Sequence, residues 1–328
     1  MTKENVLEIQ EEVVVNEEPE VVEELTEEEK RIQQLLMQER DMHKVTTKQK
    51  VVKIVVTTLC YLFLAAVAIM ILFPFYWMII SSLKTFDEYK LPTPTFFPLE
   101  RDWANFAEAF DKGNLGMLFI NTVFVGIVST ILSLVLTVLS AFAFARLEFK
   151  GKNLLFAALL ATMMIPGELF TITNYQTVSR LNWLDTYSVM IIPFLVSVFY
   201  VYLLRQNFLQ IPNELYLAAK VDGTSDLKYL WKVMIPLSLP TLISITILKL
   251  MGSWNSYMWP NLVTDGNLHK LVTNGLRNAF QVAGEGVTDI DYPVQMAAVA
   301  IVSAPLLVLF MCFRKYIMKG VSRSGIKG

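Results

Sequence analysis

A few polar side chains interrupt the long apolar runs of this sequence, and their types suit contact with a polar solute. Glu168 follows a Pro-Gly break, and Lys249 lies inside an apolar run. Because an isolated charge is costly in an apolar environment, such residues are functional candidates by default. Amide groups and aromatic faces nearby add hydrogen-bonding and stacking capacity. The candidate solute-contacting residues are Glu168, Asn174, Tyr175, Trp254, Asn255 and Tyr257.

The same residues also have a purely structural interpretation. Glu168 and Lys249 would pair with each other or with a further membrane subunit, and aromatic residues near helix ends are typical of an interfacial belt. Nothing in the sequence resembles a catalytic arrangement. The two histidines, His43 and His269, are far apart, the two cysteines have no metal or disulfide spacing, and no glycine-rich phosphate loop is present. We therefore expect no enzyme activity, no metal, no cofactor and no nucleic-acid partner.

The composition indicates a membrane protein with an acidic extension. The 328 residues are 54% hydrophobic and only 18% charged, which is unusual for a soluble domain of this length. Residues 1–43 contain 14 of the 30 acidic residues, only 4 of the 28 basic ones and no aromatic residue. Such a segment buries too little apolar surface to offset its ordering entropy. We predict a largely disordered extension over residues 1–43 and a membrane domain over residues 44–328.

Six apolar segments are long enough to cross the roughly 30 Å of hydrocarbon in a bilayer, which takes about 20 helical residues. Only helices are expected, because unpaired backbone groups are costly in lipid. The predicted fold is therefore an all-α integral membrane protein with six transmembrane helices. Pro193 interrupts the fourth segment, which is also the shortest. The segments are 52–80, 118–145, 154–174, 187–204, 235–258 and 294–313.

Basic residues in the flanks of these segments predict the orientation in the membrane. Sixteen of them fall on one side and seven on the other. The richer side contains both termini, so the positive-inside rule places both in the cytoplasm. On the opposite side, the loop over residues 83–117 begins with three prolines and is predicted to become helical around residues 103–110.

Residues 207–234, between the fourth and fifth segments, form a cytoplasmic stretch that a membrane span does not explain. Pro212 suits a helix start, and Glu214 in the first turn complements the helix dipole. Asp222-Gly223 is then a turn signal, and a hydroxyl residue after it can cap a second short helix. We predict two short helices that meet at a tight corner with small side chains. An ordinary loop folded onto the bilayer is the alternative.

At this corner the residues resemble a known family. The run from Ala218-Ala219 to Asp222-Gly223, followed by Ile235–Leu237, is similar to the "EAA" loop in membrane subunits of binding-protein-dependent ABC importers. The pattern is fairly specific, because the family has it between the fourth and fifth of six helices. There the loop is a coupling helix that seats in a groove of the nucleotide-binding subunit. The resemblance implies an ATPase-coupling role for Glu214, Ala218, Ala219, Asp222 and Gly223.

Further stretches over about residues 50–328 resemble the carbohydrate branch of this family, the oligosaccharide- and maltose-type permeases. This implies the type I importer permease fold, a sugar substrate and a bacterial-type plasma membrane. The implied partners are a second homologous permease, two ATP-binding subunits and an extracellular solute-binding protein, besides the lipid bilayer. The stretches are Ser81–Lys84, Asn121–Thr122, Ala141–Arg146, Met164–Gly167, Gly252–Pro260 and Gly320–Gly328.

One position of the loop departs from the family pattern. The glutamate that gives the loop its name falls at Leu217, so that carboxylate is absent. Glu214 lies one turn earlier and could reach a similar surface. Docking is expected to rest on Ala218, Ala219 and Gly223.

Two other functions are compatible with the sequence. An ion- or proton-coupled secondary carrier would use Glu168 as its proton site and would need no ATPase. The absence of an internal repeat and the Asp-Gly corner argue against it. A membrane-anchored scaffold or sensor would instead use the acidic extension as its active part.

Overall fold

The computed structural model describes residues 31–32, 47–266, 268–276, 280–283 and 288–322. The chain divides into two compact units, residues 1–71 and residues 72–328, and each is described by itself. The first unit contains most of α3 (Thr47–Ser82), which continues into the second. The predicted acidic extension lies outside the described residues, apart from the two helical residues 31–32.

Three described helices are individually long and apolar enough to cross a membrane. They are α3, α6 (Leu115–Arg146) and α17 (Tyr292–Ser322). Each contains one predicted segment and extends it at both ends, because a helix continues past its apolar stretch until a cap or a break ends it.

Three bent pairs of helices also pass the test for a span when each pair is taken together. In the first pair, α7 (Lys152–Thr162) is followed at 86° by η1 (Gly167–Phe170) and α8 (Thr171–Arg180). In the second, α9 (Tyr187–Ile191) and η2 (Ile192–Phe194) meet α10 (Val198–Leu209) at 45°. In the third, α12 (Asp226–Tyr229), η3 (Leu230–Met234) and α13 (Ile235–Leu237) meet α14 (Leu239–Trp254) at 81°. The described chain therefore has three spanning helices, or up to six spans if each bent pair is one.

The bends fall within the segments predicted over residues 154–174, 187–204 and 235–258, and in the first two they lie at the Pro-Gly break before Glu168 and at Pro193. Proline has no N–H to donate and its ring crowds the preceding turn, so a helix tends to end or kink there. Pro166 follows the end of α7, Pro193 lies in η2, and Pro236 precedes the bend before α14. The predicted end at residue 258 is also too late, because α14 stops at Trp254 and a separate α15 (Met258–Val263) follows.

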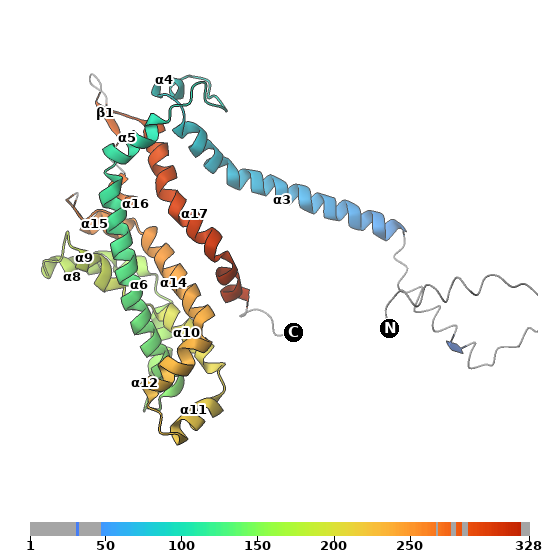
Figure 1. Cartoon of the computed structure of the whole chain (residues 1–328), viewed down its shortest axis with the longest axis vertical. Helices are drawn as coiled ribbons and strands as arrows, with labels where there is room; N and C mark the ends of the chain where they lie inside the picture. Colours follow the sequence, from blue (N-terminus) through green and yellow to red (C-terminus); the bar gives the residue numbers. More distant parts are fainter. Residues whose placement is uncertain (1–30, 33–46, 267, 277–279, 284–287, 323–328) are drawn as a thin grey trace, which may run out of the picture. The chain divides into compact units, whose positions relative to one another are not determined.

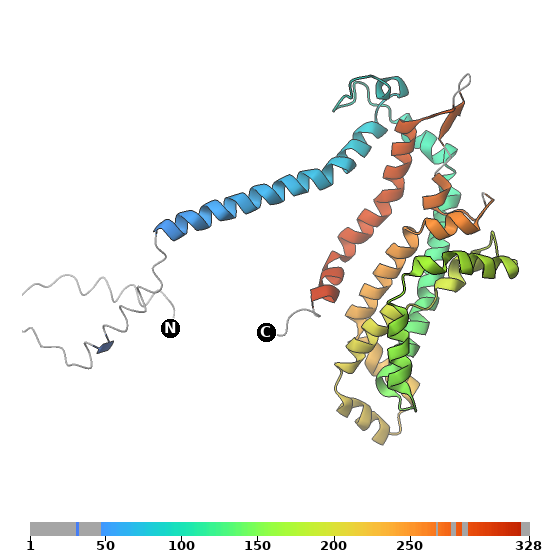
Figure 2. The ribbon, with the colours of Figure 1, turned by 180° about the vertical axis from the view of Figure 1, so that it is seen from behind.

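α6 is the central element of the second unit. Near its C-terminus it packs through Phe142 against α10, η3 and α14, and in its middle it packs through Val125 against α9 and α15. Near its N-terminus it packs against α5 (Ala104–Lys112) and α17. Figures 1 and 2 show α11 (Asn213–Val221) and α12 at one end of this unit, and α5 and β1 (Gln281–Ala283) at the other. We call these the α11 end and the α5 end.

Short elements cover the α5 end. They are α4 (Phe86–Tyr89), α16 (Val272–Gly275) and a two-stranded antiparallel hairpin of β1 and β2 (Thr288–Ile290). The all-α prediction did not include this hairpin, because strands of three residues are too short to produce a recognisable alternation.

Asn121, near the N-terminus of α6, organises the segment before α16. Its Nδ2 donates to the backbone carbonyls of Leu268 at 2.8 Å and Lys270 at 2.9 Å. The hydroxyl of Tyr187 donates to Asn121 Oδ1 at 2.7 Å. The next residue, Thr122, accepts from Val272 N at 2.9 Å. These bonds explain why a polar Asn-Thr pair stands in an apolar helix, since a buried polar group must be paired.

Candidate functional site

α11 and α12 meet at a corner at the α11 end (Figure 1). α11 ends at Val221, with Asp222 as its C-cap, and the next residue, Gly223, has a φ of +68°. Glycine adopts this left-handed conformation without steric cost. The N–H of Thr224 then donates to the carbonyl of Ala219 at 2.8 Å and closes the turn. The chain therefore turns between the two helices where Asp222-Gly223 predicts it.

A polar cluster holds the two helices of the corner together. The hydroxyl of Tyr216 donates to Asp226 Oδ1 at 2.8 Å, and Lys220 Nζ pairs with the same oxygen at 2.7 Å. The hydrogen bond to Asp226 raises the pKa of Lys220 above its ordinary value. The ring of Tyr216 also packs against Tyr229, with centroids 5.1 Å apart. These contacts fix the angle between α11 and α12.

Arg146, the last residue of α6, anchors the corner to the membrane domain. Its Nη1 donates to Asn213 Oδ1, at the first residue of α11, over 3.2 Å. Its Nη2 donates to the carbonyls of Phe208 at 3.0 Å and Ile211 at 2.5 Å, which close the preceding helix. The guanidinium fork suits three acceptors in fixed positions. Arg146 is 9% exposed and Asn213 is exposed, so the connection between α6 and α11 is buried at its α6 end only.

The surface of α11 that faces away from this packing is apolar and exposed. Leu217 is 56% exposed and Val221 is 88% exposed. An exposed apolar surface of this kind, next to small side chains, is typical of a protein contact. Of the predicted coupling residues, the exposed ones are Glu214, Ala218, Asp222 and Gly223, and the half-buried one is Ala219.

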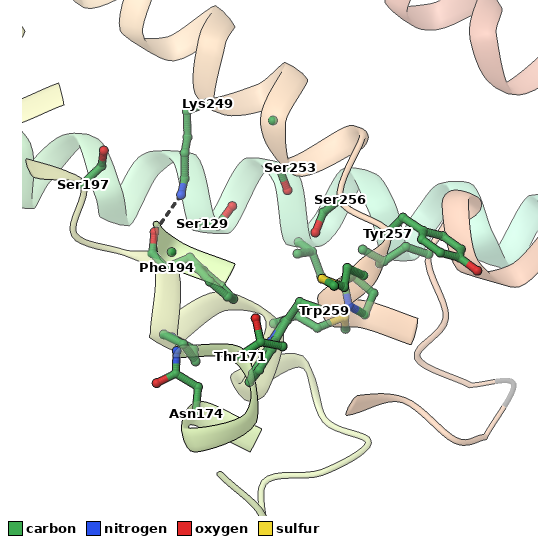
Figure 3. A pocket seen from close by; sticks show the side chains of 18 of the residues that line it. Ser129, Thr171, Asn174, Phe194, Ser197, Lys249, Ser253, Ser256, Tyr257 and Trp259 are labelled. Carbon is green, nitrogen blue, oxygen red and sulfur yellow. Dashed lines mark hydrogen bonds between the residues drawn. The ribbon is translucent and has the colours of Figure 1, made fainter. Parts of the chain in front are cut away.

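A cavity of about 590 Å³ opens where the bent spans approach α6 and α14 (Figure 3). Its walls include the broken backbone at Gly167 and at Pro193. Irregular backbone at membrane depth is tolerated where it lines a cavity. Residues with hydroxyl groups come from several parts of the chain to line this space, and they are Ser129, Thr171, Ser197, Ser253, Ser256 and Tyr257.

Lys249 crosses one side of this cavity. It extends from α14, and its Nζ donates to the backbone carbonyl of Phe194 at 2.7 Å (Figure 3). Phe194 ends η2, where the bend leaves backbone carbonyls without the partners of a continuous helix. Glu168 lines the same cavity but does not form an ion pair with Lys249 in the described structure. The pairing considered from the sequence is therefore replaced by a side-chain bond to a bent backbone.

The structure brings half of the predicted solute-contacting residues together. Glu168, Asn174 and Tyr257 line the cavity, and the other three do not. Trp254 packs against Phe119 at the α5 end, with ring centroids 5.8 Å apart. The Asn255 amide donates to the carbonyl one turn earlier in its own helix, and Tyr175 packs in the cluster around α9.

Sequence reasoning missed most of the cavity hydroxyls. A serine or threonine in an apolar helix often bonds to the carbonyl one turn back and has no other role. Ser244 and Thr246 of α14 do this, with bonds to Pro240 and Leu242. Ser253 and Ser256, a few residues later, line the cavity instead. Only the bends decide which hydroxyls meet. The described residues contain no group of three or more side chains suited to hold a metal ion.

Residues 133–323 match the family described as the binding-protein-dependent transport system inner membrane component. The chain is 30% identical over 274 residues to the arabinooligosaccharides transport system permease protein AraQ of Halalkalibacterium halodurans, covering 83% of this chain and 95% of that relative. It is 26% identical over 269 residues to the sn-glycerol-3-phosphate transport system permease protein UgpE of Yersinia pestis, covering 80% and 94%.

A solved structure has the same fold. It is a bacterial ABC transporter involved in the import of the acidic polysaccharide alginate, and one of its chains aligns with a TM-score of 0.72 at 22% identity. The alignment covers 83% of this chain and 98% of that chain. At this level of identity the comparison supports the fold alone, and it agrees with the all-helical importer permease fold predicted from the sequence.

Proposed function

The chain belongs to the family of binding-protein-dependent transport system inner membrane components, and on this premise we propose that it forms half of a sugar translocation path driven by a separate ATPase. Family membership makes it a transport subunit of an ABC importer in the membrane and not an enzyme. ATP is therefore bound and hydrolysed by partner subunits, and this chain supplies part of the path and the connection to them.

The substrate class is supported by the chemistry of the cavity. Hydroxyl and amide groups from α6, α8, α14 and two segments between helices line a space of about 590 Å³, which is in the range of small-ligand sites. Such groups pair with the hydroxyls of a sugar, and an aromatic ring such as that of Tyr257 can stack on its apolar face. A relative is named for arabinooligosaccharide transport. We therefore propose an oligosaccharide or another sugar as the transported solute.

The observation that carries the coupling proposal is the bond between Arg146 and Asn213. It ties the exposed corner of α11 and α12 to the end of a spanning helix. A partner that pulls on the corner therefore acts on α6, which lines the cavity through Val125 and Ser129. ATP binding would draw the corners of two permeases together, and the helices would switch from an inward-facing to an outward-facing path.

The remaining partners and the orientation follow from the same proposal. The corner and both termini lie in the cytoplasm, where the excess of basic residues is found. A second homologous permease supplies the other half of the path, two ATP-binding subunits contact the two corners, and an extracellular binding protein delivers the sugar. A related solved structure is a complex of the alginate ABC transporter with its substrate-bound periplasmic protein.

The test is sugar uptake by proteoliposomes that contain the complete importer. Residues 215–226 are replaced by a flexible Gly-Ser linker of the same length. We expect loss of ATP-dependent uptake and of ATPase co-purification, with normal membrane insertion. Replacing residues 148–150, an exposed stretch of the loop between α6 and α7, is the matched control and should leave both intact.

Uptake by this chain in vesicles without any ATPase subunit, with a rate that depends on pH and on Glu168, would contradict the proposal and favour a proton-coupled carrier. Full uptake by the linker variant would contradict the coupling role of the corner. Removing residues 1–43 tests the membrane-anchored scaffold or sensor, which would use the acidic extension as its active part. Our proposal expects transport to continue without these residues.

A further inference from the structure

An exposed aromatic tip stands beside the C-terminal end of α3, within the second unit. The tip is the stretch Thr95–Leu99, and three of its side chains are turned outward. Phe96 is 60% exposed, Phe97 is 72% exposed and Leu99 is 71% exposed. Residues 91–99 contain no charged residue and three prolines. Apolar side chains that are exposed together in a stiff loop indicate a contact surface, because their exposure to water is unfavourable.

The tip is held in a defined shape by buried polar groups. Lys84 is only 2% exposed, and its Nζ donates to the carbonyl of Thr95 at 2.5 Å. The carboxylate of Glu88 accepts from the backbone N–H of Leu99, at 3.0 and 3.1 Å for its two oxygens. It also accepts from the Thr95 hydroxyl at 2.5 Å. A buried cation and a buried anion therefore fix a five-residue loop, whose apolar side chains remain outside.

The tip folds back along α3 rather than away from it. The hydroxyl of Tyr76 donates to the carbonyl of Phe96. The ring of Phe97 meets Tyr76 edge to face, with centroids 6.4 Å apart, and Phe96 meets Trp77 in the same way at 6.1 Å. The tip is therefore at the level of Tyr76 and Trp77, which lie inside the spanning helix.

The length of α3 sets the depth of that level. Its apolar part, Val51–Ser82, has 32 residues, about 48 Å at a rise of about 1.5 Å per residue. The hydrocarbon core is roughly 30 Å thick, so about 9 Å extends beyond it at each end of a centred helix. Tyr76 is six residues before Ser82, again about 9 Å. Tyr76, and the tip beside it, therefore lie at the boundary between hydrocarbon and headgroups, where aromatic belts are found.

We propose that the Thr95–Leu99 tip inserts into the bilayer surface and anchors the loop between α3 and α5 to lipid. The same end of α3 carries further exposed apolar side chains. Phe73 is 48% exposed and packs on the rings of Tyr76 and Trp77, which contact the tip, and Ile79 is 51% exposed. A lipid surface fits an uncharged aromatic tip at this depth. The anchor holds the loop next to α5 at a fixed height, independently of which sugar is transported.

The test uses the complete importer in nanodiscs with an environment-sensitive fluorophore on a single cysteine. Cys60 and Cys312 are first replaced by serine. The label is placed by Phe97→Cys, with Phe96→Cys as a second site in case the first variant assembles poorly. Trp103→Cys is the shallower control, because the neighbouring Asp102 N donates to Leu83 O beyond the end of α3. Val221→Cys, on the distant corner, is the control outside the lipid.

Lipids brominated near the headgroup end of their acyl chains should quench the label at position 97. We expect at least about twofold more quenching there than at position 103, since the levels of Tyr76 and Leu83 beside them differ by roughly 10 Å in depth. The label at position 221 should not respond to brominated lipid.

Quenching at position 97 no greater than at position 221 would overturn the proposal. A photo-crosslinker at position 97 that captures the second permease or the binding protein, without lipid quenching, would assign the tip to that protein instead.

Discussion

The guanidinium of Arg146 and the amide of Asn213 are 3.2 Å apart, and they join the last residue of a spanning helix to the first residue of the exposed corner. The two residues are 67 positions apart in the chain. The same guanidinium also closes the helix that precedes the corner, through the carbonyls of Phe208 and Ile211. One side chain therefore contacts three segments, and in the proposed mechanism it transmits a displacement of α11 to α6.

Replacing Arg146 with methionine should uncouple the corner from the spanning helix. The carbonyls of Phe208 and Ile211 lose a charged donor, and such bonds contribute about 1.5–3 kcal/mol each. We expect uptake by the reconstituted importer to fall by at least about tenfold, because a loss of about 1.4 kcal/mol already corresponds to that factor. Arg146→Lys should be intermediate, since an ammonium cannot reach all three acceptors.

The matched control for Arg146 is Lys150→Met, which removes an exposed cation from the loop between α6 and α7. Unchanged uptake in Arg146→Met, with normal ATPase stimulation, would show that the bond to Asn213 has no part in coupling.

Gly223 should be sensitive to substitution because of its backbone conformation and its place at the corner. Its φ is +68°, and a side chain in the left-handed region costs about 1–2 kcal/mol. Gly223→Val should reduce ATPase co-purification and uptake together, and Gly223→Asn should restore most of both, since asparagine tolerates this region.

Gly151 provides the matched control for that backbone strain. Its φ is +81°, and, as at Gly223, no atom lies within 4 Å of the position of an added Cβ. Gly151→Val should therefore have a similar effect on thermal stability but leave ATPase co-purification intact. Equal loss of co-purification in both variants would mean that strain, and not docking, is being measured.

Lys249 should matter through its bond to the bent backbone of the second span pair. Lys249→Met removes this charged donor from the Phe194 carbonyl at the cavity wall, and a hydrogen bond to a charged group contributes about 1.5–3 kcal/mol. We expect uptake to fall by about tenfold or more, which corresponds to about 1.4 kcal/mol, and Lys249→Arg to retain most of it.

Thr246→Val, on the same helix, is the control for Lys249. It removes only a bond to the carbonyl one turn back, and Thr246 does not line the cavity. Its uptake should be close to that of the unmodified importer. If Lys249→Met and Thr246→Val behaved alike, the Lys249 bond would have no special role in the path.

The carboxyl of Asp291, at the start of α17, should make the stability of the protein depend on pH. Its Oδ1 accepts from Val294 N at 3.3 Å and caps the helix. Burial raises the pKa of this carboxyl, the nearby Glu108 and Asp102 raise it further, and the Val294 bond and Lys112 lower it. Because the folded-state pKa is above the unfolded one, folding binds a proton, and stability falls as pH rises from about 3.8 through the folded pKa.

Asp291→Asn keeps a capping side chain and removes the charge, so it should raise the melting temperature of the detergent-solubilised protein at pH 7. The gain should disappear as the pH is lowered toward 4. Asp291→Ala loses the cap, at a cost of about 1 kcal/mol, and this cost should be largest at low pH, because at pH 7 the removal of the buried charge partly offsets it. A gain for Asp291→Asn that did not change with pH would contradict the electrostatic explanation.

The sequence by itself determined the class of the protein and the position of the corner between α11 and α12, for which we propose the coupling role. Membrane spans are visible in composition because lipid requires long apolar helices, and the turn at Asp222-Gly223 is local, since glycine alone permits its φ at no cost. The resemblance around Ala218 and Ala219 led to the family that the matched residues 133–323 establish.

The tertiary structure decided which side chains meet. Three predicted path residues line the cavity and three do not, because the bends near Pro166, Pro193 and Pro236 turn helix faces by angles that no periodicity encodes. The sequence placed Arg146 in a family-like stretch but did not predict its hydrogen-bond partner. The fold brings Asn213 of α11 beside it. Polar contacts between distant segments depend on the relative placement of helices, and that placement is set by packing around α6 and not by local sequence.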